Sequence, residues 1–326
     1  MAAADQIKGL IRSFAEGDEA GFYATAMQIA ASEARSGHLV LANELKKLID
    51  KAKSTKSSRL GIVKPFPISA SQKELNDLLE LIQPHERLQE MILESKVQKS
   101  LRRVLDEQHK VELLRKNNLS PRKKLLFVGP PGCGKTMSAR VLATELGLPL
   151  FIIRLDGLIS RYMGESIAKL RLIFDAMNQF RAVYFFDEFD SIGTTRNQPN
   201  DVGEIKRVLN TFLLQIEKDN SNSLVIAATN FPESLDQALF RRFDDIIQFP
   251  LPDLQEIIAL YQKELADFKL SDTFNIQKIA AASVGLSYSD VHRVCKDIVK
   301  DFLVYGPDEV SEERLIIYAQ QRRHPF

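Results

Sequence analysis

The run GPPGCGKT, from Gly129 to Thr136, has the residue types and spacing of a phosphate-binding loop. Its glycines let backbone N–H groups turn toward phosphate oxygens, and the positive end of the helix that should follow adds to the attraction. In such a loop Lys135 neutralises the β- and γ-phosphates, and the hydroxyl of Thr136 binds Mg²⁺. We therefore expect a nucleotide site here. A chance glycine-rich turn is the alternative, but an apolar run precedes this one and a helical pattern follows it.

The whole loop and the residue after it are expected to contact the nucleotide. This set is Gly129, Pro130, Pro131, Gly132, Cys133, Gly134, Lys135, Thr136 and Met137. We expect Cys133 to contribute its backbone rather than a redox-active thiol. The other cysteine, Cys295, is distant in sequence, so we predict no disulfide and a reducing compartment.

A second reactive pair follows the apolar run AVYFF, where Asp187 and Glu188 are neighbours. Carboxylates at the carboxyl end of a buried strand lie where open α/β sheets bind ligands. Beside a phosphate loop, Asp187 is expected to hold Mg²⁺, and Glu188 is expected to orient and polarise the attacking water. Glu188 therefore favours hydrolysis over passive nucleotide binding. A solvated acidic cluster is the alternative interpretation.

Short apolar runs predict the strands that must position these residues. They cover residues 125–128, 150–153, 182–186, 224–228 and 245–249. Unbroken apolar runs that alternate with helical patterns are typical of strands buried on both faces of a parallel sheet. We therefore predict a doubly wound α/β domain.

Changes in sequence pattern divide the chain into four parts. Residues 1–53 have apolar side chains at helical spacing and predict a small helical module, whereas residues 54–72, with Ser, Pro and Lys, are typical of a linker. The α/β domain is expected over residues 73–252, with a helical lead-in from 74 to 118. A C-terminal helical lid is expected over residues 253–326, with helices near 253–267, 274–283, 287–303 and 311–321.

Composition excludes several classes of protein. The 326 residues include 44 Lys and Arg against 43 Asp and Glu, so a net charge of +1 gives no strong attraction to nucleic acid or anionic lipid. A 44% hydrophobic content is that of a globular chain rather than a disordered one. No apolar run approaches the ~18 residues that span a bilayer, and the first residues lack a signal-peptide pattern. We expect a cytoplasmic protein without a membrane partner.

With these motifs in view, residues 85–326 resemble the AAA family of ATPases, within the AAA+ superfamily. The segments GPPGCGKT, FFDEFDSIG, VIAATN, LDQALFRRFD and GLSYSDV occur in the family's order, and they are most similar to the branch that includes spastin and katanin. The resemblance does not cover the first 70 residues. It implies a P-loop NTPase fold with a helical lid, ATP and Mg²⁺ as cofactors, and ATP hydrolysis.

The resemblance also assigns residues that complete the active site. Asn230 matches the sensor 1 residue, which helps to position water. Arg241 and Arg242 match the arginine-finger pair, which reaches the nucleotide of a neighbouring subunit and stabilises charge in the transition state. A finger supplied by a neighbour implies a homo-oligomer, and the family assembles hexameric rings. A solvated arginine pair is the alternative.

Family resemblance also extends to the substrate channel and the lid. Tyr162 and Met163 match the first pore loop, which grips an extended polypeptide in the central pore, although a tyrosine in a loop is also commonly packed. A second pore loop is a candidate role for Thr194, Thr195 and Arg196. In the lid, Tyr288 and Ser289 stand where the family commonly has glycine and alanine, which bears on adenine packing. We expect Arg293 to be a solvated helix residue rather than a sensor 2 arginine.

The leading functional prediction is an ATP-driven machine that remodels, unfolds or threads protein substrates. The N-terminal module is expected to recruit a substrate or adaptor. A resemblance to compact bacterial AAA proteins sometimes encoded beside a subtilisin-like protease also suggests a protease partner. One alternative is a nucleotide-gated interaction scaffold without translocation. The other is a DNA-acting AAA+ ATPase, against which stand the near-neutral charge and the absence of interleaved aromatic and basic residues.

Overall fold

The computed structural model describes residues 19–35, 38, 42–45, 47, 49, 75, 77–158, 163–190, 201–268, 270, 274–306 and 310–323. The chain forms two compact units, residues 1–65 and residues 66–326. The first unit contains helix α2 (Glu19–Arg35), in which Ala30 is buried. Within the described ranges, no helix is long and apolar enough to cross a membrane.

A six-stranded sheet forms the centre of the second unit, in the order β1-β3-β4-β5-β2-β6. Strand β1 pairs antiparallel with β3, and the other pairs are parallel. The strands are β1 (Leu79–Ile82), β2 (Lys124–Val128), β3 (Leu150–Ile153), β4 (Val183–Phe186), β5 (Leu224–Thr229) and β6 (Asp245–Gln248). The prediction of an α/β fold with a parallel sheet is therefore confirmed.

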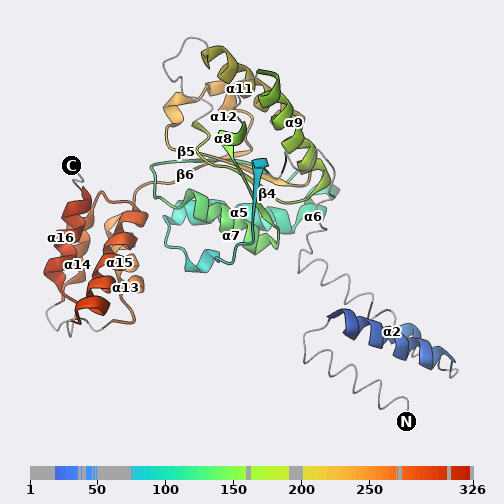
Figure 1. Ribbon diagram of the computed structural model, residues 1–326, viewed down its shortest axis with the longest axis horizontal. Coiled ribbons are helices and arrows are strands. Elements are labelled where there is room, and N and C mark those ends of the chain that lie inside the picture. Colours follow the sequence, from blue (N-terminus) through green and yellow to red (C-terminus); the bar gives the residue numbers. More distant parts are fainter. Residues whose placement is uncertain are drawn as a thin grey trace. The chain divides into compact units, whose positions relative to one another are not determined.

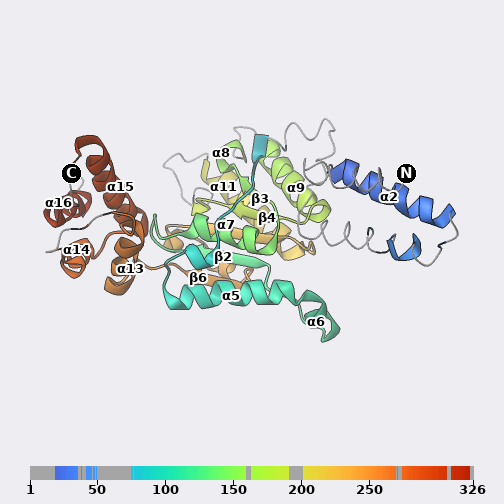
Figure 2. The ribbon, with the colours of Figure 1, turned by 90° about the horizontal axis from the view of Figure 1, so that it is seen from below.

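Helices cover both faces of this sheet, which is why its central strands are apolar throughout. Helices α5 (Ser95–His109) and α7 (Lys135–Leu146) lie on one face, and α9 (Met163–Gln179) and α11 (Asp201–Lys218) lie on the other (Figure 1, Figure 2). Side chains along β4 alternate between the two cores. Phe185 packs toward α5 and α7, whereas Tyr184 and Phe186 pack toward α9 and α11.

One element of the lead-in differs from the prediction. Residues 74–118 were expected to be helical, but β1 occupies residues 79–82 and a 3-10 turn, η1, covers Leu88–Glu90. Backbone groups on the outer edge of β3 pair with β1, and this long-range pairing overrides the local helical pattern. The lead-in then becomes helical in α5 and α6 (Val111–Lys116).

The lid consists of α13 (Leu254–Glu264), α14 (Ile276–Ser283), α15 (Tyr288–Tyr305) and α16 (Glu312–Arg323), close to the predicted helices. These helices share a hydrophobic core of their own. Capping boxes fix two of the helix starts. Asp253 and Glu256 cap α13, and Ser287 and Asp290 cap α15, so each helix begins at a defined residue.

Candidate nucleotide site

The predicted phosphate loop connects the carboxyl end of β2 to the start of α7. Gly129 has a φ of 151°, and a Cβ there would lie 2.1 Å from the carbonyl oxygen of Phe249. Only glycine fits this close approach of two backbones. Because α7 begins at Lys135, the loop residues lie before the N-terminus of a twelve-residue helix, where backbone N–H groups favour anions.

Lys135 is held tightly inside this loop. Its Nζ donates hydrogen bonds to the carbonyl oxygens of Gly129 (2.7 Å) and Pro130 (2.8 Å) and to Oδ1 of Asn230 (2.8 Å). Burial lowers the pKa of Lys135, while the negative charges of Asp187 and Asp190 act to raise it. The ammonium group is therefore held between the loop carbonyls and the end of β5.

The two predicted Mg²⁺ ligands lie in contact with each other. Oγ1 of Thr136, at the start of α7, donates a 2.9 Å hydrogen bond to Oδ2 of Asp187, which follows β4. A hydroxyl and a carboxylate oxygen suit Mg²⁺, which commonly takes one or two protein oxygens and completes its shell with phosphates and water. The pair therefore fits the ion that the family implies.

Glu188 is exposed at the end of β4 and has a φ of 49°, which is unusual for a residue other than glycine. Its neighbours hold it there. Its own N–H donates to Oδ1 of Asp187 (2.9 Å), and the N–H of the buried Phe189 donates to the carbonyl of Ala228 (2.8 Å). The chain thus turns sharply just after the carboxyl end of the strand.

Asp190 is a site residue that sequence reasoning missed. Its Oδ1 accepts a 3.2 Å hydrogen bond from the backbone N–H of Asn230, so the acidic segment after β4 is tied to the end of β5. The only signal in the sequence is a third acidic residue after Asp187 and Glu188. Nothing in the sequence indicates which strand end it contacts.

The predicted arginine pair lies after the short helix α12 (Gln237–Phe240) and before β6. Nε of Arg242 forms a 3.1 Å ion pair with Glu217, whereas Arg241 is exposed. In the described part of the chain, no hydrogen bond or ion pair joins either guanidinium to Lys135 or Thr136. Arg242 is therefore held by the end of α11, and the exposed Arg241 is accessible to another molecule.

The pore-loop predictions fall largely beyond what the structure describes. Tyr162, Thr194, Thr195 and Arg196 lie outside the described residues. Met163 is the first residue of α9, and its side chain is not described.

The start of α15 in the lid lies directly on the phosphate loop. Gly132 has a φ of 76°, and a Cβ there would lie 2.4 Å from Oγ of Ser287. The N–H of Ser289 donates a 3.1 Å hydrogen bond to the carbonyl of Gly132. The lid therefore contacts the loop through backbone and small side chains, which sequence reasoning had not connected.

Tyr288 extends this lid contact. Its ring packs against the cores of both the α/β domain and the lid, and its hydroxyl donates a 2.8 Å hydrogen bond to Glu256. Burial and the nearby Glu256 carboxylate raise the pKa of Tyr288. Arg293, further along α15, is exposed.

Both cysteines are free thiols in apolar surroundings. Cys133 and Cys295 are 1% exposed, and burial raises the pKa of each. A buried, protonated thiol is a poor nucleophile. Cys133 therefore packs within the loop rather than presenting a reactive group.

Comparisons with known proteins identify the family of this chain. The model of the ATPase family associated with various cellular activities (AAA) matches residues 125–251. An uncharacterized AAA family ATPase, y4kL of Sinorhizobium fredii, is 34% identical over 96% of this chain and 93% of its own length. The likeness to y4kL therefore extends over nearly the whole of both proteins.

Other relatives match only part of the chain. Katanin p60 ATPase-containing subunit A1 of Strongylocentrotus purpuratus is 37% identical over 54% of this chain, which spans 36% of that protein. Meiotic spindle formation protein mei-1 of Caenorhabditis elegans is 35% identical over the same share, and this chain spans 39% of it. The crystal structure of the FIGL-1 AAA domain shares the fold, with a TM-score of 0.62 and 23% identity over 80% of this chain and 91% of that one. With a relative above 30% identity matched almost end to end, the chain belongs to the AAA family of ATPases and is an enzyme that hydrolyses ATP.

Proposed function

We propose that this ATPase works as a hexameric ring that couples ATP hydrolysis to the remodelling and threading of protein substrates. The contrast between two parts of the site carries the proposal. Within one chain Lys135 is hydrogen-bonded to Asn230, and Thr136 to Asp187, whereas Arg241 is exposed and no hydrogen bond or ion pair among the described residues joins it to them. A site that lacks its own arginine is completed when a neighbouring subunit supplies one.

The residues of one chain account for most of the hydrolysis step. Thr136 and Asp187 would hold Mg²⁺, which neutralises charge on the phosphates when it is bound. Lys135 binds the β- and γ-phosphate oxygens. The exposed Glu188 carboxylate orients a water molecule and accepts its proton, and Asn230 positions that water for attack on the γ-phosphate. Arg241 of a neighbouring subunit then stabilises the charge that develops during transfer.

Threading requires a second function, which the pore residues would supply. In a ring, Tyr162 and Met163 grip an extended polypeptide by stacking and apolar contact, which tolerates many sequences. The N-terminal module would bring a substrate or adaptor to the ring, and a partner protease could receive the threaded chain. A cytoplasmic location suits such a machine.

Mixing two inactive variants tests whether the arginine acts between subunits. Arg241→Ala keeps the phosphate site but loses the finger, and Lys135→Ala loses the site but keeps the finger. Each alone should have little ATPase activity, and mixtures should recover part of it because some interfaces contain both intact halves. Arg293→Ala, which changes an exposed lid arginine, is the control and should behave as wild type. Absence of recovery at every mixing ratio would contradict the proposal.

Threading is tested separately with Tyr162→Ala. The variant should hydrolyse ATP and form the same ring, yet fail to unfold a fluorescent protein fused to an unstructured tag. Tyr305→Ala changes a tyrosine that is 76% exposed in the lid, and serves as the matched control. Normal unfolding by Tyr162→Ala would favour a nucleotide-gated scaffold instead.

A further inference from the structure

An open cleft of about 1270 Å³ lies at the amino ends of the parallel strands, at the opposite end of the sheet from the phosphate loop. The loop follows the carboxyl end of β2, whereas this cleft is lined by residues at the amino ends of β2 and β5. Its walls are α6 with the end of α5, the connection 119–124 and the connection 217–222. Nothing in the hydrolysis step uses this cleft.

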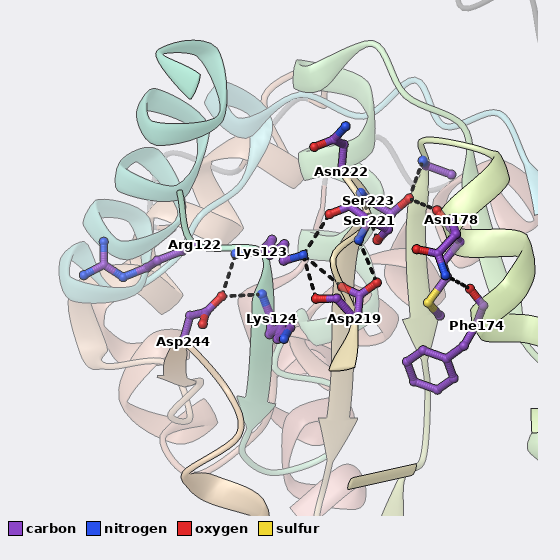
Figure 3. A network of polar contacts seen from close by, with 12 residues as sticks. Arg122, Lys123, Lys124, Phe174, Asn178, Asp219, Ser221, Asn222, Ser223 and Asp244 are labelled. Atoms are coloured by element: carbon purple, nitrogen blue, oxygen red, sulfur yellow. Dashed lines mark hydrogen bonds and ion pairs between the residues drawn. The ribbon is translucent and has the colours of Figure 1, made fainter. Parts of the chain in front are cut away.

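Most acidic side chains in the cleft form hydrogen bonds or ion pairs with other residues of the chain. Nζ of Lys123 contacts the carbonyl oxygens of Asp219 (3.0 Å) and Ser221 (2.8 Å) and pairs with the buried Asp219 carboxylate at 3.1 Å (Figure 3). Oδ2 of Asp244 accepts the backbone N–H groups of Lys123 and Lys124, each at 2.9 Å (Figure 3). This network holds the two connecting segments against the strand ends.

Acidic groups on the cleft wall are paired in the same way. Glu107 forms ion pairs with Arg103 and Arg122, and Glu217 pairs with Arg242. Of the acidic residues that line the cleft, Glu112 alone lacks a cationic or backbone partner among the described residues.

The basic residues of the cleft are not balanced in this way. Eight Lys and Arg side chains line it, against five Asp and Glu. In the described structure, no carboxylate lies within ion-pair distance of Lys110, Lys116, Lys124 or Arg181. Burial and the charge of Lys123 lower the pKa of Lys124, against the opposing effect of the nearby carboxylates Asp219, Asp244 and Glu217. The cleft therefore presents excess positive charge.

Apolar groups accompany this charge. Leu113 and Leu119 line the same cleft, and each is 58% exposed. The lining contains no Phe, Tyr or Trp on which a nucleic-acid base could stack. Carboxylates interspersed with apolar side chains match this surface better than nucleic acid does. From these features we infer that the cleft docks an acidic, leucine-containing peptide segment of a partner protein, apart from the pore and the nucleotide site.

Direct binding of a defined probe tests this inference. The probe is a fluorescein-labelled peptide of alternating Glu and Leu, and its control has Gln at every Glu. Fluorescence anisotropy with the full-length protein should detect binding of the Glu peptide, with an affinity that falls as the salt concentration rises. The Gln peptide should bind little. Because the readout is binding without ATP, its result is independent of ring assembly and hydrolysis.

Charge reversal at the rim locates the binding. Lys110→Glu combined with Lys116→Glu should lower the affinity for the Glu peptide by about tenfold or more, because two favourable charge contacts become repulsive. Lys96→Glu combined with Lys99→Glu is the matched control, since both lysines are exposed on α5 and outside the cleft. The control should bind as wild type, and both double variants should keep the wild-type ATPase rate.

Three results would overturn the inference. The first is no binding of the Glu peptide by the wild-type protein. The second is equal loss of binding in the cleft variant and the control variant, which would mean a general charge effect. The third is tighter binding of an oligothymidine of similar charge, lost in the cleft variant, which would assign the cleft to nucleic acid.

Discussion

The ammonium group of Lys135 and the amide oxygen of Asn230 are 2.8 Å apart and joined by a hydrogen bond. This contact links the phosphate loop after β2 to the end of the neighbouring strand β5. Asn230 is held in turn through its backbone N–H by Asp190, which follows β4. Three strand ends are therefore connected through one chain of hydrogen bonds, which makes the position of Asn230 depend on Asp190.

Asp190→Asn should slow hydrolysis more than it weakens nucleotide binding. The substitution keeps the size of the side chain but replaces a charged acceptor, whose hydrogen bonds are worth about 1.5–3 kcal/mol, by a neutral one. We expect a fall in kcat of the order of tenfold with little change in the Kd for ATP. Asp267→Asn, at an exposed position, is the control. A wild-type kcat for Asp190→Asn would remove Asp190 from the positioning of Asn230.

Tyr288→Phe should destabilise the lid while preserving its packing. The ring stays between the two cores, but the hydrogen bond to Glu256 is lost, at a cost of about 1–2 kcal/mol in the free energy of unfolding. Urea denaturation of Tyr288→Phe, Glu256→Gln and the double variant measures the coupling between the two residues. Tyr305→Phe, at a 76% exposed position, should leave stability unchanged. Additive effects in the double variant would contradict the coupling.

ATP affinity should fall with rising pH earlier than an ordinary lysine would predict. Burial lowers the pKa of Lys135 below its usual 10.5, so the empty protein loses this proton at a lower pH, whereas bound phosphate favours the charged form. The Kd for ATP should therefore rise as pH increases through the lowered pKa, with proton uptake on binding. Calorimetry in buffers of different ionisation enthalpy measures both.

Lys135→Arg is the control for this pH effect, because arginine stays charged throughout the range. Its Kd should lack the alkaline rise, whatever its value at neutral pH. An equal alkaline rise in both proteins would mean that another group titrates.

The buried strands could be predicted because each contains a run of apolar residues that is visible in the local sequence. Runs 125–128 and 224–228 correspond to Lys124–Val128 and Leu224–Thr229, since strands covered on both faces need apolar residues at every position. Strand β1 was missed because it is an edge strand. Leu79 is buried but Leu81 is 46% exposed, so no unbroken apolar run marks it, and its partner β3 is distant in sequence.

The site divides in the same way between local and long-range features. A contiguous motif identified Lys135 and Thr136, because the turn, the cation and the helix start are neighbours in sequence. Asp190 and Ser287 were missed because their roles come from contacts with Asn230 and Gly132, on other elements. Local pattern indicates which residues bear chemistry, whereas the packing of strand ends and the lid decides which of them meet.

The mass of the Glu188→Gln variant, measured with and without Mg-ATP, tests most directly whether copies of this chain assemble into a ring. The variant should bind ATP but not hydrolyse it, so assembled subunits should accumulate, and light scattering after gel filtration should show a shift from the 36.9 kDa monomer to a ring of about six subunits. Adding Arg241→Ala should weaken that shift. A 36.9 kDa species that persists at saturating Mg-ATP would contradict the account of a ring completed between copies of this chain.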